Sequence, residues 1–236
     1  MTDWREVFER TRAVPPHSQT ARQADKPSQG FQLSFKHLDG ASVFQVICLT
    51  TLRVSFFDTV HRHFFGRTWR NKKPPSCLFK HENPFFHVVY FHTALLLPCV
   101  VAVVELVSLG SQHAIGRGFG ILQLFSGASE TPLLSGSQRM PFYGGTPRAL
   151  LTPGFRDVEL NGLLTVMDGV QLLYTLQPHP ALLPIMHLFP QNTLVSDHTS
   201  IPGLMAIGPA VETGLLFLLM VEGEPPLTSA CRGSLG

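Results

Sequence analysis

The chain has 236 residues, of which 44% are hydrophobic and only 14% charged, and its formal net charge is +2. A net charge so close to zero argues against nucleic-acid binding through bulk charge, and the charged fraction lies below the roughly 25% typical of soluble domains. Four widely spaced cysteines without a Cys-x-x-Cys pair, and a charged first segment without an apolar core, predict a cytoplasmic chain without a signal peptide.

The first 30 residues predict a short helix followed by an extended arm. Trp4, Val7 and Phe8 fall on one face of a helix over 2–12. A proline pair and many small polar residues mark 13–30 as a linker or arm.

Short strands dominate the next section, 31–177. Phe31, Leu33 and Phe35 alternate with polar residues, which is the pattern of a half-buried strand. Further strands are predicted at 43–49, 52–58, 86–91, 99–107, 118–125, 163–166 and 171–176, with a loop over 126–145. Since no long segment has helical periodicity, the fold class is predicted to be all-β, an antiparallel β-sandwich with exposed edges. Frequent prolines predict an irregular Pro-rich tail over 178–236.

One apolar stretch, 83–104, is long enough to cross a bilayer and contains no formally charged residue. Pro84 and Pro98 lie within it, and His87 and His92 would be costly in lipid. We therefore predict two core strands joined by a proline turn, with a single membrane-spanning helix as the alternative. A second apolar stretch, 201–221, is interrupted by two prolines and a glutamate.

Patterns that often carry chemistry are incomplete here. His61 and His63 have the spacing of two zinc ligands on one strand face, but no further ligand lies at a suitable spacing, so no metal is predicted. The glycine-rich run 116–120 precedes an apparent strand instead of a helix, which favours a turn or bulge over a phosphate loop. Ser135-Gly-Ser137 lacks the context of a nucleophile elbow. We predict no catalytic residues, no cofactor and no small-molecule substrate; the chain is not expected to be an enzyme.

The most distinctive surface signal is a stretch in which basic residues interleave with Phe and Trp. Its candidate contacts for a partner protein or an anionic surface are Arg62, Arg67, Arg70, Lys72 and Lys73. The alternative is a hairpin whose aromatic residues face the core while the cations are solvated.

Several blocks in one order resemble the amino-terminal region of the nephrocystin-4 family. They begin with Trp4 and Val14-Pro-Pro16, and they include Leu-Arg-Val-Ser-Phe-Phe-Asp at 52–58 and Arg-His-Phe-Phe-Gly-Arg-Thr-Trp at 62–69. Others follow at 90–93, 100–105, 118–122, 145–151, 174–176, 178–182 and 201–204. No match is found after about residue 206, and the family's proteins are several times longer than this chain.

The resemblance implies a non-catalytic scaffold with C2-like β-domains at the ciliary transition zone, basal body, centrosome and cell junctions. It implies other nephrocystins, such as nephrocystin-1, and RPGR-interacting proteins as partners in cilium assembly. Isolated aspartates, among them Asp39 and Asp58, do not form the Asp-x-Asp loops of a calcium-binding C2 domain. The alternative functions are a calcium-independent lipid-binding C2 module and, below it, a single-pass membrane protein.

Overall fold

The computed structural model describes residues 13–24, 26–40, 50–71, 87–109, 114–126, 136–152 and 164–196, together with the backbone of 204–206 and 219–221. In these residues eight strands form one sheet: β1 (Gln29–Asp39), β2 (Thr50–Asp58), β3 (His63–Arg70), β4 (His87–Thr93), β5 (Val100–Leu109), β6 (Ala114–Gln123), β7 (Ser137–Gly144) and β8 (Val166–Pro178). The other elements are α2 (Ser18–Ala21), the 3₁₀ helices η3 (Pro147–Leu151) and η4 (Pro180–Leu188), and the strand pair β9 (Leu204–Ala206) and β10 (Leu219–Val221).

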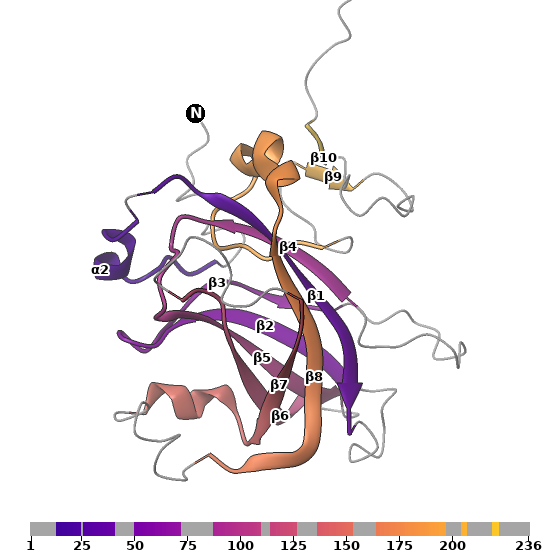
Figure 1. Ribbon diagram of the computed structural model, residues 1–236. Helices are drawn as coiled ribbons and strands as arrows, with labels where there is room; N and C mark the ends of the chain where they lie inside the picture. The colour runs from indigo at the N-terminus through magenta and orange to yellow at the C-terminus, as the bar shows by residue number, and fades with distance from the viewer. Residues whose placement is uncertain are drawn as a thin grey trace, which may run out of the picture.

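The main sheet is antiparallel throughout, with the order β3-β2-β5-β6-β7-β8-β1-β4. It curls so that β1, β4 and β8 face the strands at the other end of this order (Figure 1). The all-β prediction is confirmed.

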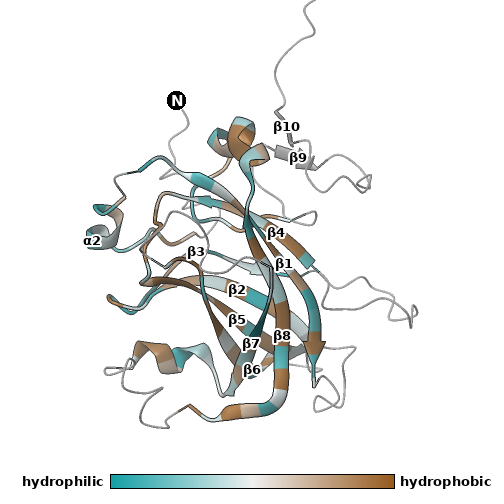
Figure 2. Ribbon diagram, in the orientation of Figure 1, coloured by the Kyte–Doolittle hydropathy of each residue, from teal (hydrophilic) through white to brown (hydrophobic). Residues whose placement is uncertain are grey.

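One hydrophobic core fills the space inside the curled sheet. Along β2, Leu52, Val54 and Phe56 point inward and are at most 2% exposed. Phe56 meets Phe91 of β4 edge to face, with ring centroids 5.1 Å apart, so the two ends of the sheet pack across the core. In β8 the alternation of hydrophilic and hydrophobic residues is visible along the strand (Figure 2).

A smaller apolar cluster lies on the opposite, outer face of the sheet. Phe57, Val103 and Phe119 are buried there beneath Leu150 of η3. The apolar half of this outer face is therefore covered by the chain itself.

A segment after η4 connects the two edge strands of the sheet. We call residues 189–196 the closing segment. Its Thr193 forms a parallel bridge with Arg67 of β3. Its Val195 exchanges two backbone hydrogen bonds of 2.8 Å with Tyr90 of β4. The closing segment thus occupies part of each edge and holds the curled sheet shut.

The amino-terminal arm covers another part of the β3 edge. Val14 and Gly66 exchange backbone hydrogen bonds of 2.9 and 2.7 Å. Gly66 has φ +72°, and a Cβ atom there would overlap the carbonyl oxygen of Asn192, so both conformation and space require glycine. The expectation of exposed edges is wrong at these positions, because the chain pairs with its own edges.

The predicted strands over 31–36, 52–58, 99–107 and 118–125 correspond to β1, β2, β5 and β6, and 171–176 lies within β8. The prediction of a loop over 126–145 is wrong, because β7 occupies 137–144. The arm contains one helical turn, α2, and the tail contains η4. The predicted helix over 2–12 and the predicted strand at 43–49 lie outside the described residues.

The apolar stretch 83–104 contributes β4 and the first half of β5, with Pro98 in the turn between them. The prediction of two core strands is confirmed for its described part, 87–104. No helix in the described part of the chain is long and apolar enough to cross a membrane. Most of the second apolar stretch, 201–221, lies outside the described residues.

Candidate functional sites around strand β3

The predicted basic contacts do not form one compact patch. Arg62 precedes β3 in a turn with φ +51°, and Arg70 ends the strand, which places them at opposite ends of an eight-residue element. Both side chains are exposed. Arg67 is half-buried in the middle of β3, where its backbone pairs with the closing segment. Lys72 and Lys73 lie outside the described residues.

The aromatic residues of the same stretch serve the core. Phe65 and Trp69 are 2% and 5% exposed and belong to the central cluster. Phe64 points to the other face, where it packs at 4.6 Å between ring centroids against Phe57. These rings are unavailable for stacking on nucleic-acid bases, which agrees with the alternative in which the aromatic residues turn inward.

Strand pairing places Arg70 in a different group from the one that the sequence suggested. It lies directly opposite Arg53 of β2. Arg53 in turn lies opposite Glu105 of β5, and its guanidinium nitrogen Nη1 is 3.5 Å from Oε2 of that carboxylate. Glu105 could not be identified from the sequence, because it lies 52 positions after Arg53 and only the pairing of β2 with β5 brings the two residues together.

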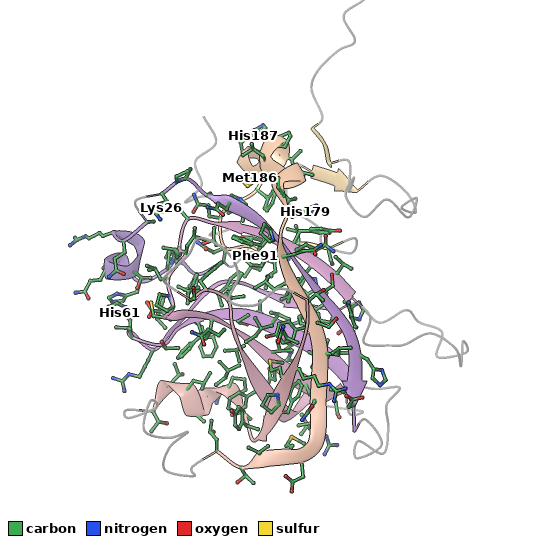
Figure 3. The ribbon with its side chains drawn as sticks, viewed as in Figure 1. Lys26, His61, Phe91, His179, Met186 and His187 are labelled. Carbon is green, nitrogen blue, oxygen red and sulfur yellow. The ribbon has the colours of Figure 1, made fainter. Side chains whose placement is uncertain are left out.

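A second polar group joins the turn after β2 to α2. The fully buried carboxylate of Asp58 accepts hydrogen bonds from the Thr20 hydroxyl and from the backbone N–H groups of Val60 and His61. The ring of His61 approaches it with Nδ1 2.8 Å from Oδ2. Its other nitrogen, Nε2, lies 2.8 Å from the side-chain oxygen of Gln19. Figure 3 shows His61 beside the short α2 coil.

Opposing effects act on the Asp58 carboxyl. Burial alone would raise its pKa, but the hydrogen bonds from Thr20, from the His61 side chain and from the two backbone N–H groups together outweigh burial and lower the pKa below its usual value. Asp58 therefore stays ionised and holds the arm against the sheet.

The Thr20, His61 and Asp58 side chains contain the residue types of a hydrolytic triad but not its geometry. In such a triad, the nucleophile and the carboxylate contact opposite nitrogens of the imidazole. Here both contact Nδ1, at 2.9 Å from Thr20 and 2.8 Å from Asp58. Thr20 is also only 1% exposed, and its hydroxyl donates a hydrogen bond to Asp58. Its oxygen is therefore not presented to a substrate. The group anchors the arm.

The two candidate zinc ligands do not share a strand face. His61 lies in the turn before β3, stacked on His17 with ring centroids 3.9 Å apart. His63 begins β3, and its Nε2 lies 3.0 Å from the carbonyl oxygen of Pro15. No group of three or more metal-ligating side chains occurs within the described ranges.

The glycines of 116–120 serve strand packing. Gly118 lies beside a bulge in the β5–β6 ladder, and a Cβ atom there would come within 2.8 Å of the carbonyl oxygen of Tyr143 in β7. Of the predicted turn or bulge, the structure shows a bulge, and it lies within β6 instead of at the start of the strand.

A cavity of about 460 Å³ lies beneath η4, lined by Pro16, Ser28, His92, Met186 and residues of the closing segment. Met186 and His187 lie on the η4 coil in Figure 3. The buried His92 has its Nδ1 2.8 Å from the Ser28 hydroxyl and its Nε2 2.9 Å from the carbonyl oxygen of Phe189. Because both ring nitrogens are engaged within the fold, this histidine holds the cavity wall together and has no nitrogen left for a ligand.

No family model matches the chain. Its sequence is 44% identical to nephrocystin-4 of Homo sapiens over an alignment of 223 positions, and the match covers 87% of the chain. It is 36% identical to nephrocystin-4 of Xenopus laevis over 220 residues, again 87% of the chain. The chain is a relative of nephrocystin-4.

The chain spans 15% of the length of each of these two nephrocystin-4 proteins. The resemblance inferred from the blocks between residue 4 and about residue 204 is confirmed. Activities and partners of a complete nephrocystin-4 need not all reside in this part, and they enter below as proposals.

Proposed function

We propose that the chain is a non-catalytic β-module that binds partner proteins at the base of the cilium. Other nephrocystins, including nephrocystin-1, and RPGR-interacting proteins are the proposed partners, and support of cilium assembly is the proposed role. The observation that carries this proposal is the 44% identity to a nephrocystin-4 across 87% of the chain.

The polar groups of the described fold support a binding role. The Asp58–His61 group anchors the arm, and the ring nitrogens of His92 are engaged by Ser28 and Phe189. The exposed cations Arg62 and Arg70 are available for contact with other molecules. Arg67, Lys72 and Lys73 are proposed contacts on the basis of the sequence alone.

The direct test is to measure binding of the purified chain to purified nephrocystin-1 by surface plasmon resonance at physiological ionic strength. We expect saturable binding that Arg67→Glu/Arg70→Glu weakens at least fivefold while the unfolding midpoint is retained. Arg139 is exposed on β7, away from these residues. Arg139→Glu is therefore the control, because it reverses the charge of one surface arginine in the same way. The same purified chain can be assayed against RPGR-interacting proteins.

A tagged chain expressed in ciliated cells tests the location. We expect it to concentrate at the ciliary base. A diffuse distribution, together with no binding to any of these purified proteins, would contradict the proposal. Salt-sensitive binding to anionic liposomes without protein binding would replace it with the lipid-binding alternative.

A further inference from the structure

The outer face of β3, β2 and β5 carries a row of charged side chains with unequal numbers of each sign. Arg70, Arg53 and Glu105 are direct neighbours across the three strands. The row thus contains two guanidinium groups and one carboxylate, and that carboxylate contacts Arg53. Like charges directly opposite one another destabilise a sheet, so this arrangement leaves the row in need of a second anion.

Arg53 and Arg70 differ in their environment. The side chains of Arg53 and Glu105 are 26% and 17% exposed, so their ion pair is partly shielded from water and held in place. Arg70 is exposed at the end of β3, and its side chain forms no ion pair within the described ranges. An incoming acidic segment would meet one guanidinium held in place by Glu105 and one that is exposed. Guanidinium forks suit bidentate recognition of carboxylates.

The part of the outer face next to Arg53 and Arg70 is polar. Ser55 and Thr68, next along the same face, share a hydrogen bond of 2.9 Å. The apolar half of this face is already covered by η3. The open half therefore offers hydroxyl and guanidinium groups and suits a charged occupant.

We propose that Arg53 and Arg70 bind an acidic, extended segment of a partner protein. Directly opposite residues of two strands lie about 5 Å apart, and carboxylates at alternate positions of an extended chain lie roughly 7 Å apart. Flexible arginine side chains span that difference, so one acidic residue reaches each guanidinium. This inference rests on the proposed function, since it takes the partner to be a protein.

Two other anionic partners fit the face less well. Nucleic acid is disfavoured because Phe65 and Trp69 of β3, and Phe119 opposite Glu105, are buried and present no ring for base stacking. A lipid surface calls for clusters of about four to eight basic residues, whereas this row pairs two arginines with a glutamate.

Fluorescence anisotropy of the full chain with a labelled ten-residue peptide of alternating Glu and Thr tests the proposal. We expect binding that weakens with added salt, and a loss of at least tenfold in affinity for Arg70→Glu and for Arg53→Gln. Arg139→Glu should bind like the unmodified chain. Glu105→Gln should bind the peptide several-fold more tightly, because the competing carboxylate is gone. Circular dichroism of each variant checks folding.

Unchanged affinity in Arg70→Glu, or an equal loss in Arg139→Glu, would overturn the proposal. So would a Glu105→Gln variant that binds no more tightly than the unmodified chain. Binding of the chain to vesicles with 20% phosphatidylserine and to a single-stranded RNA decamer is measured in parallel. Stronger Arg70-dependent binding to either of these than to the peptide would also overturn it.

The two proposals fail separately. Binding to nephrocystin-1 that is unaffected by Arg70→Glu and Arg53→Gln removes the arginine row and leaves the protein-binding function. Arg70-dependent binding of the peptide, without binding to any nephrocystin or RPGR-interacting protein, keeps the arginine row and removes the proposed partners.

Discussion

The hydroxyl of Thr20 donates a hydrogen bond to the carboxylate of Asp58 and so joins α2 to the end of β2 across 38 positions of sequence. The same carboxylate oxygen faces Nδ1 of His61 at 2.8 Å. The arm is therefore attached to the sheet at Asp58 as well as at the backbone bridge between Val14 and Gly66.

Asp58→Asn should loosen this attachment. The new amide places a donor against the Thr20 hydroxyl or the His61 ring, and hydrogen bonds to a buried charged group contribute about 1.5–3 kcal/mol. We expect the free energy of unfolding to fall by about 2 kcal/mol, measured by urea denaturation. Asp39→Asn, at a half-exposed surface pair with His37, should change it by less than about 0.5 kcal/mol. Equal effects of the two variants would contradict the anchoring role.

The stabilisation by Asp58 should depend on pH. Burial opposes ionisation, but the hydrogen bonds prevail and the folded pKa lies below its usual value. The contribution is thus present above the unfolded pKa of about 3.9 and is lost as the pH falls through the folded value. The difference in unfolding free energy between the unmodified chain and Asp58→Asn should shrink below about pH 4. A difference that stays constant there would argue against an ionised Asp58.

His92 should produce a pH dependence in a higher range. Burial lowers its pKa, although the hydrogen bond to the Phe189 carbonyl opposes this effect. The unfolded state therefore takes up the proton first, so stability falls as the pH drops below about 6.5 and levels off below the folded pKa. His92→Gln should lack this component. His179, whose pKa burial also lowers, remains in both proteins, so their difference isolates His92.

Gly66→Ala should be among the most damaging small substitutions in the sheet. It combines strain at φ +72° with overlap between the new methyl group and the Asn192 carbonyl oxygen. We expect a loss of more than about 2 kcal/mol by denaturant unfolding. Gly169→Ala has φ +74° but meets no atom within 4 Å, so it should cost only about 1 kcal/mol. Similar losses at the two sites would show that overlap with the closing segment contributes nothing.

The hydrogen bond from the Trp69 indole to the Ser196 hydroxyl, 2.9 Å long and buried, should contribute to closure of the sheet. Ser196→Ala leaves that N–H without this acceptor, at a cost of about 1–3 kcal/mol. A double-mutant cycle with Trp69→Phe should give a coupling energy of about 1 kcal/mol. Ser55→Ala, at an exposed hydrogen bond, should have a smaller effect. Additive single effects would exclude the direct interaction.

Strands with a marked alternation were accessible from the sequence. β1 was predicted from Phe31, Leu33 and Phe35, all of which are fully buried. β7 was missed because only Met140 and Phe142 of its eight residues are buried, and Pro141 stands between them. Two apolar residues around a proline do not establish a period of two.

The arrangement of the candidate sites depended on contacts that a sequence does not reveal. The interleaved arginines of β3 resemble one patch in the sequence, yet the length of β3 and the register shift between β2 and β3 separate them. Arg70 joins Arg53 and Glu105 because strands β3, β2 and β5 pair side by side. The closing segment was equally hidden, since its partners Arg67 and Tyr90 lie more than a hundred positions upstream.

The position of the closing segment in the chain has a consequence for biosynthesis. All eight strands of the sheet leave the ribosome before residues 189–196 do. Until then, the backbone groups of β3 and β4 that later meet Thr193 and Val195 remain open to pairing with neighbouring nascent chains. Several chains on one polysome would therefore present open sheet edges to one another until residues 189–196 emerge.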